Sequence, residues 1–176
     1  GRLRFNATVF YADYTDVQVT TQQFVTVMGV PTNATAVLNA GKQVNQGAEI
    51  ETVWQPVDAF TLSTSIGYLD AEFDEYLAFN PATRVLEDIS DNTTVAQAPE
   101  NTASLGVQYD FEPFSFGALS ARMDVAYKDE FVFHPFQNLY DAADDRTLVN
   151  GRLSLNEIKM GCCEKGALRV SLWGKN

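Results

Sequence analysis

The sequence predicts an all-β fold: an antiparallel up-and-down meander of about seven strands, forming an incomplete section of a large transmembrane β-barrel. Three observations predict this fold. Apolar and polar residues alternate with a period of two, each alternating segment is about ten residues long or longer, and the connections alternate between long and short. Successive side chains of a strand point to opposite faces, so each segment has one apolar and one polar face. In a membrane barrel the apolar face meets lipid and the polar face lines the interior, or lumen.

The first segment sets this pattern. Its predicted strand covers Arg2–Val19, in which Leu3 and Phe5 share the apolar face. The stretch Thr20–Ala36 is rich in polar and small residues, and we expect strand ends joined by a loop there.

The second predicted strand, Leu38–Gln55, carries two carboxylates. Ile50 and Trp54 point outward in this strand, whereas Glu49 and Glu51 point inward. A charge near the middle of the lipid face would cost roughly 2–4 kcal/mol, so we expect both carboxylates to face the lumen.

A tight turn at Pro56–Ala59 leads to the third predicted strand, Phe60–Tyr76, whose far end is acidic and aromatic. The connection Leu77–Glu100 is longer than most loops in compact domains. Loops of this length are mostly functional or disordered, so we expect a role in recognition.

The last four predicted strands repeat the alternation, and the first of them shows it most clearly. They cover Thr102–Phe111, Leu119–Phe133, Thr147–Ile158 and Ala167–Trp173. The connections between them are a short turn, a medium-length acidic segment and a second turn, at Glu112–Gly117, His134–Arg146 and Lys159–Gly166.

The lengths of these connections favour a membrane barrel. They are long or medium after the first, third and fifth strands and short after the second, fourth and sixth. Outer-membrane barrels have short periplasmic turns and long extracellular loops. Trp54, Phe60, Tyr109 and Phe111 then gather at the short-turn end, where an aromatic girdle belongs. A soluble antiparallel sandwich with one buried face is the alternative. It gives no reason for long connections to lie at one end of the sheet and short connections at the other.

Composition excludes several functions. The chain has 176 residues, with 12 Lys and Arg against 23 Asp and Glu, so its net charge of −11 disfavours nucleic-acid binding. His134 is the only histidine. No second histidine is present around which a His-based metal cluster or a Ser–His catalytic pair could be built. We expect no enzyme, no cofactor and no metal site.

Cys162 and Cys163 are adjacent in the sequence. We expect two plain thiols in a turn, with a vicinal disulfide or a reactive thiol as the alternatives.

Two sets of residues are candidates for function. Aromatic side chains and the histidine in the long connections could form a ligand platform: Phe133, His134, Phe136, Tyr140 and Tyr76. The alternative is that these rings pack against the base of their own loops. Charged residues on the inward face could contact a plug or a solute: Glu49, Glu51, Arg122, Asp124, Arg152 and Arg169. The alternative is that these charges pair with one another in a polar lumen.

Several pieces resemble a known family. They are Val9–Val19, Asn39–Glu51, Gln55–Ala71, Ala98–Thr102 and Leu172–Asn176. In their order and spacing, these pieces are similar to the C-terminal barrel portion of TonB-dependent outer-membrane receptors. No single piece is a sharp motif, but together they cover nearly the whole chain.

The resemblance implies a plugged barrel of about 22 strands in the bacterial outer membrane. Its partners would be the lipid bilayer, its own plug domain, a TonB-type energy coupler and a scarce solute such as an iron chelate or vitamin. Residues 1–176 would then be one section of the barrel domain, without the plug domain and the final strand. A passive porin or adhesin barrel, and a soluble carbohydrate-binding β module, are the alternatives.

Overall fold

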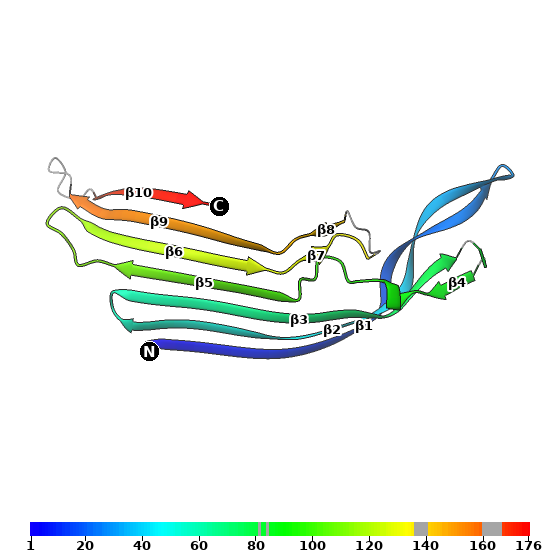
Figure 1. Ribbon diagram of the computed structural model, residues 1–176, viewed down its shortest axis with the longest axis horizontal. Helices are drawn as coiled ribbons and strands as arrows, with labels where there is room; N and C mark the ends of the chain where they lie inside the picture. The colour runs from blue at the N-terminus through cyan, green and yellow to red at the C-terminus, as the bar shows by residue number, and fades with distance from the viewer. Residues whose placement is uncertain (81, 84, 136–140, 160–166) are drawn as a thin grey trace.

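The computed structural model contains one large antiparallel sheet in which long strands follow one another in chain order (Figure 1). The structure describes residues 1–80, 82–83, 85–135, 141–159 and 167–176. The long strands are β1 (Leu3–Val27), β2 (Val30–Val57), β3 (Phe60–Asn80), β5 (Asn101–Asp110), β6 (Ala118–Lys128), β9 (Arg146–Lys159) and β10 (Ala167–Lys175). β1 and β10 are the two edges, so the sheet is open. The predicted up-and-down meander of about seven strands is therefore confirmed.

Short elements accompany the loop end of this sheet. Strand β4 (Val85–Asp88) pairs with β3, and β7 (Phe131–Val132) pairs with β8 (Ala142–Ala143). A single 3₁₀ turn, η1 (Ser90–Asn92), follows β4. The β2–β3 and β5–β6 turns lie at the left of Figure 1, and the longer connections after β3 and β6 lie at its right, as the alternation of connection lengths predicted.

The pairing register places each residue opposite a residue of the same face on the neighbouring strand. Thr64 of β3 pairs with Leu105 of β5, which pairs with Val125 of β6 and then Val149 of β9. In the next row, Ser63 of β3 pairs with Gly106 of β5, which pairs with Asp124 of β6. Directly opposed residues of paired strands share a face, so apolar and polar rows alternate across the sheet.

The apolar face has no second layer over it. Val19 and Tyr76 are the two buried hydrophobic residues among those described, and both lie near the loop end. In the middle of the sheet Ile66 is 55% exposed, Leu153 45% and Leu105 38%. A soluble sandwich would cover these side chains with a facing sheet. The described residues instead form a single layer, as the wall of a barrel does.

Aromatic residues flank the apolar band at both ends. At the short-turn end Tyr109 and Phe111 meet edge to face, with ring centroids 4.8 Å apart. At the loop end Tyr11 and Tyr68 are exposed on the same face. The nine residues from Phe60 to Tyr68 span roughly 26 Å along β3, at about 3.3 Å for each of the eight steps between them. An outer-membrane barrel has an apolar band about 25 Å tall between such girdles.

For Thr20–Ala36 the prediction of strand ends is correct, but the prediction of a loop between them is wrong. β1 and β2 continue as one hairpin to a two-residue turn at Met28 and Gly29, with φ of 50° and 82°. Two positive φ angles are typical of the tight hairpin turn that matches strand twist. The stretch between Asp16 and Lys42 contains no charged residue and is rich in Thr and Val, which favour strands. The hairpin projects beyond the sheet at the right of Figure 1.

Two further bounds differ from prediction. The strand expected over Leu119–Phe133 ends at Lys128, because Phe131–Val132 leaves the sheet and pairs with β8. β3 runs on past the predicted end to Asn80, since its last residues pair with β4 instead of β5. The turn that contains Cys162 and Cys163 lies outside the described residues.

Candidate functional site

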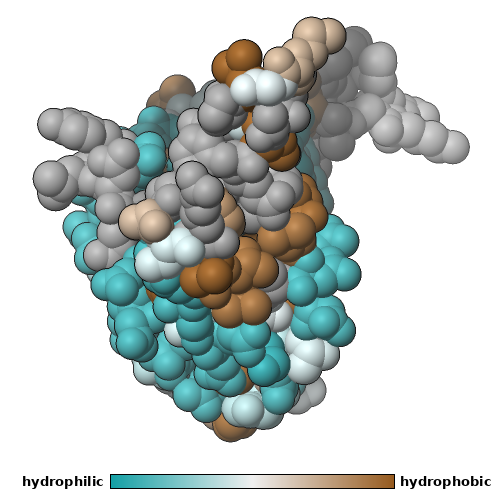
Figure 2. All heavy atoms as spheres, turned by 90° about the vertical axis from the view of Figure 1, so that its right-hand side faces the viewer, coloured by the Kyte–Doolittle hydropathy of each residue, from teal (hydrophilic) through white to brown (hydrophobic). Residues whose placement is uncertain are grey.

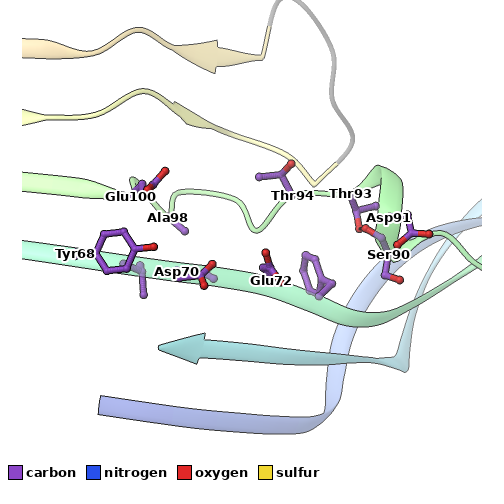
Figure 3. A pocket seen from close by; sticks show the side chains of 12 residues that line it. Tyr68, Asp70, Glu72, Ser90, Asp91, Thr93, Thr94, Ala98 and Glu100 are labelled. Atoms are coloured by element: carbon purple, nitrogen blue, oxygen red, sulfur yellow. The ribbon is translucent and has the colours of Figure 1, made fainter. Parts of the chain in front are cut away.

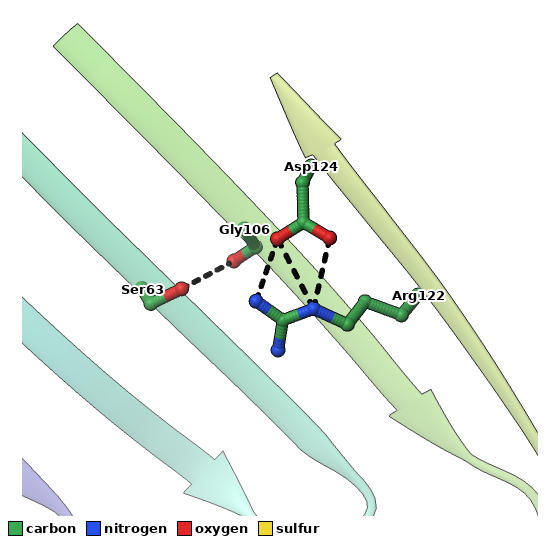
Figure 4. Close-up of polar contacts among 4 residues, drawn as sticks. All are labelled: Ser63, Gly106, Arg122 and Asp124. Atoms are coloured by element: carbon green, nitrogen blue, oxygen red, sulfur yellow. Dashed lines mark hydrogen bonds and ion pairs between the residues drawn. The ribbon is translucent and has the colours of Figure 1, made fainter. Parts of the chain in front are cut away.

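The polar face of the sheet carries an ion pair between two residues of β6, Arg122 and Asp124 (Figure 4). Arg122 donates from Nε to Asp124 Oδ2 over 2.9 Å and from Nη2 to Asp124 Oδ1 over 2.6 Å. Gly106 leaves the space for this pair, because a Cβ there would lie 3.0 Å from Asp124 Oδ1 and 3.1 Å from Arg122 Nη2. Ser63 donates to the Gly106 carbonyl beside it, over 3.3 Å. On the polar face a side-chain hydrogen bond thus joins β3 to β5, and an ion pair within β6 lies beside it.

Glu49 and Glu51 lie on the same polar face, in β2. Glu49 is opposite Thr8 and Gly67, and Glu51 is opposite Asn6 and Ser65. The Asn6 side-chain amide donates to Glu51 Oε2 over 3.4 Å. Both carboxylates are exposed on this face, so they are open to whatever fills the space beside the sheet.

Arg152 and Arg169 complete the set predicted to face inward. With Arg122 they line a cavity of about 330 Å³ at the short-turn end of the polar face. The structure therefore brings three of the six predicted residues together, from β6, β9 and β10.

A second region with cavities lies at the loop end. Figure 2 shows this end, where hydrophilic residues cover much of the surface around a smaller apolar group. One cavity of about 490 Å³ lies between residues 68–73 of β3 and the connection 90–100 (Figure 3). It is bounded by two backbone hydrogen bonds, Leu69 N–H to Glu100 O at 2.8 Å and Ile89 N–H to Tyr76 O at 3.0 Å. Carboxylates line it: Asp70, Glu72, Asp91 and Glu100.

The neighbouring cavity, of about 580 Å³, combines carboxylates with aromatic rings. Tyr127 and Phe131 line it together with Glu100, Asp129 and Asp145. The Tyr127 hydroxyl donates to Asp129, and the Asn101 side-chain amide donates to the same carboxylate over 2.7 Å. These bonds hold the pKa of Asp129 below its ordinary value of 3.8, with the Tyr127 hydroxyl as the largest cause.

Backbone hydrogen bonds join the two long connections into one structure. Gln97 N–H donates to Val132 O over 2.8 Å, and Thr94 N–H donates to Pro135 O over 3.0 Å. Phe133 N–H donates to Asp141 O over 2.7 Å. The connection 89–100 therefore meets residues 132–135 at the loop end, and the second cavity has lining residues from both connections.

The predicted ligand residues fall into different environments. Phe133 is 47% exposed and meets Phe131 edge to face at 5.2 Å, and His134 is exposed beside it. Tyr76 is 1% exposed, packs edge to face on Phe73 at 5.0 Å, and donates from its hydroxyl to Thr20 O over 3.4 Å. Its ring thus supports the base of the β1–β2 hairpin. Phe136 and Tyr140 lie outside the described residues.

Residue-by-residue reasoning missed Tyr127, Phe131 and Asp129 as cavity residues. The signal was present, because a strand ends in Tyr127 and Lys128 and is followed at once by two carboxylates and Phe131. Lys128 Nζ lies 4.1 Å from the centroid of the Phe131 ring, a cation–π geometry.

Across the described ranges, no group of three or more His, Cys, Asp or Glu side chains is arranged to hold a metal ion. Within the same ranges, no helix is long and apolar enough to cross a membrane.

Comparison with known families gives one match. The model of the family described as "TonB dependent receptor-like, beta-barrel" matches residues 1–176. Comparison with curated proteins gave no match, and comparison with solved structures gave none. This family consists of receptors and transporters of the outer membrane of Gram-negative bacteria. The chain is therefore a member of the TonB-dependent receptor-like β-barrel family, and it forms a section of the barrel wall.

Proposed function

We propose that this chain is the wall section of an energy-coupled receptor in the bacterial outer membrane, which takes up a scarce solute such as an iron chelate or a vitamin. One observation supports it most: the sheet is a single layer with an exposed apolar face and a polar face that carries charges. Family membership supports the receptor role. The partners in this proposal are the lipid bilayer, a plug domain inside the barrel, the TonB-type energy coupler and the solute.

The loop end is the proposed recognition surface. Its two cavities share Thr94, Ala98 and Glu100, so a ligand there would touch both long connections. Carboxylates and aromatic residues line both cavities. This chemistry favours a solute with positive charge or many hydrogen-bond donors over a strongly anionic one. Phe133 and His134 are exposed nearby, and Phe136 and Tyr140 belong to the same connection.

Growth on single nutrients tests this proposal. A strain that lacks the full-length receptor should lose growth on one member of a panel of iron chelates, vitamins and oligosaccharides at limiting concentration. Removing the energy coupler from the parent strain should cause the same loss. Uptake that persists without the coupler would indicate a passive porin instead. Unchanged growth of the receptor-deficient strain on every nutrient would contradict the proposed transport role.

A further inference from the structure

Strand β3 has an open edge at the loop end. On the side of β5 its pairing stops at Tyr68, opposite Asn101, and the next backbone bond there runs from Leu69 N–H to Glu100 O. On its other side, β3 stays paired with β2 throughout this stretch. We call residues 70–75 the free edge, because one side of them has no strand partner in the described part of the chain. The free edge borders the cavity of about 490 Å³ (Figure 3).

The backbone groups of the free edge point away from β2. Successive residues of a strand in an antiparallel sheet bond alternately to the strands on its two sides. Because Leu69 N–H bonds on the side of β5, Ala71 and Phe73 turn their N–H and C=O groups to that side as well. Among the described residues, no backbone hydrogen bond reaches Ala71 or Phe73 from there. A row of unpaired backbone groups on a strand edge is a template for a further strand.

The connection 90–100 lies beside the free edge but does not pair with it. Gln97 N–H donates to Val132 O, and Thr94 N–H donates to Pro135 O. Both groups therefore bond to the other long connection and not to β3. Figure 3 shows Asp70 and Glu72 of β3 along one side of the cavity, with residues of the connection across from them. The cavity thus leaves room for a ligand next to the backbone of β3.

The charge of the cavity decides which ligand fits. Its lining includes the carboxylates of Asp70, Glu72, Asp91 and Glu100 but no Lys, Arg or His. Within the described ranges, no ion pair joins any of these four carboxylates to a basic side chain. A second copy of this chain would bring the same carboxylates to the edge, and opposed like charges destabilise a strand pair. A small cation would match the charge but would offer the backbone of β3 no paired donor and acceptor. A basic polypeptide segment offers both.

We propose that the free edge binds an extended, basic peptide segment of the solute as an added antiparallel strand. Strand addition gains its affinity from main-chain hydrogen bonds and its specificity from alternate side chains. Directly opposed residues share a face, so the peptide residues opposite Asp70 and Glu72 are basic. Those opposite Ala71 and Phe73 are small or apolar. This inference rests on the proposed function, and it names the part of the solute that the loop end holds.

Isomeric N-methylated peptides test strand addition on the full-length receptor in detergent. The probe is a capped pentapeptide in which lysine and valine alternate, with lysine at both ends. One isomer carries N-methyl groups on its two valines, and the other carries them on two of its lysines, so mass and charge are identical. In the proposed register the valine N–H groups point to β3 and the lysine N–H groups point away from it. Calorimetric titration measures the affinity of each peptide.

Methylation should matter only on the valines. The isomer methylated on lysine should bind like the unmodified peptide, whereas the isomer methylated on valine should bind about tenfold more weakly, the factor that corresponds to roughly 1.4 kcal/mol. Equal affinity of the two isomers would overturn strand addition, and so would the absence of binding by every peptide. Calcium binding without peptide binding would assign the carboxylates to a cation instead.

Receptor variants locate the peptide at the free edge. Ala71→Pro removes an N–H that points away from β2, so it leaves the bonds between β2 and β3 in place. It should lower the affinity for the unmodified peptide about tenfold. Ala71→Ser keeps the N–H and is the matched control. Equal affinity of these two variants would show that the peptide binds elsewhere.

A second variant covers the case in which the proline prevents assembly. Combined Asp70→Asn and Glu72→Gln should weaken binding of the lysine peptide about tenfold and leave binding of a peptide with glutamine for lysine unchanged. An unchanged affinity for the lysine peptide would contradict the proposed charge pairing. A receptor that assembles and takes up a solute but binds none of the peptides would overturn this inference alone. A full-length protein without heat-modifiable migration on gels would instead refute the proposed function itself.

Discussion

The two faces of the sheet are built by the same strands and differ only in which alternate residue they use. In β5, Leu105 pairs with Val125 on one face, and its neighbour Ser104 belongs to the other. The first face exposes large apolar side chains with no layer over them, whereas the second carries ion pairs and cavities. A shift of one residue would exchange the two sets. The difference teaches that each face has its own solvent: hydrocarbon for one and a watery interior for the other.

Arginine substitutions on alternate residues of β5 should show the largest difference between the two faces in membrane assembly. Leu105→Arg or Val107→Arg should block membrane assembly, because arginine near the middle of the lipid face costs roughly 2–4 kcal/mol. Ser104→Arg or Gln108→Arg should be tolerated far better, since the polar face already carries arginines. Heat-modifiable migration of the full-length receptor measures assembly. Equal damage at both pairs of positions would show that the faces are assigned wrongly.

Changes at the loop end should reduce solute uptake without affecting assembly of the barrel. Replacing residues 91–98 by an equal-length Gly/Ser segment removes lining residues from both loop-end cavities and should abolish uptake while leaving heat-modifiable migration unchanged. The same replacement of residues 85–87 is the control, because none of these three residues lines either cavity. Uptake that survives the first replacement would count against the recognition role.

Close packing on the polar face gives a smaller effect. A Cβ at Gly47 would lie 2.2 Å from the Tyr68 carbonyl oxygen and 2.6 Å from Phe10 Cζ. Gly47→Ala should therefore lower the free energy of unfolding by about 1–3 kcal/mol, the usual cost of overpacking. Gly151→Ala is the matched control, because a Cβ there meets nothing within 4 Å. Urea-induced unfolding in detergent measures both, and similar midpoints would contradict this packing.

The smallest effect concerns acid at the loop end. The pKa of Asp129 is lowered by its bonds to Tyr127 and Asn101, so its stabilisation is complete above the ordinary value of 3.8 and is lost as pH falls through the lowered pKa. Protease cleavage in residues 129–135 should rise below about pH 4. Asp129→Asn should flatten that pH dependence; an identical profile in the variant would show that another group controls it.

Much of the fold is predictable because apolar and polar residues alternate along each strand. A period of two assigned Leu105 and Ser104 to opposite faces, and the register confirmed this across four strands. The full length of the β1–β2 hairpin was missed because its small polar residues also occur in loops. There the Met28–Gly29 turn and the strand preference of Thr and Val decided the structure.

The cavities were less predictable, since they depend on long-range pairing. Glu100 and Asp70 line one cavity because β5 starts at Asn101, opposite Tyr68, and leaves the next residues of β3 without a strand partner on that side. Arg122 and Arg152 face each other only in the observed register of β6 and β9. Neither relation can be read from the spacing of residues along the chain.

Spin labels along β5 of the full-length receptor in lipid bilayers test the central claim most directly. Each position from Thr102 to Gln108 would carry a label in turn, in a background in which Cys162 and Cys163 are serine. Collision with oxygen, which concentrates in hydrocarbon, should be high at Ala103, Leu105 and Val107 and low at the residues between them, with the opposite pattern for a water-soluble nickel reagent. Accessibility without this alternation, or water access at all positions, would contradict a wall with one side in lipid.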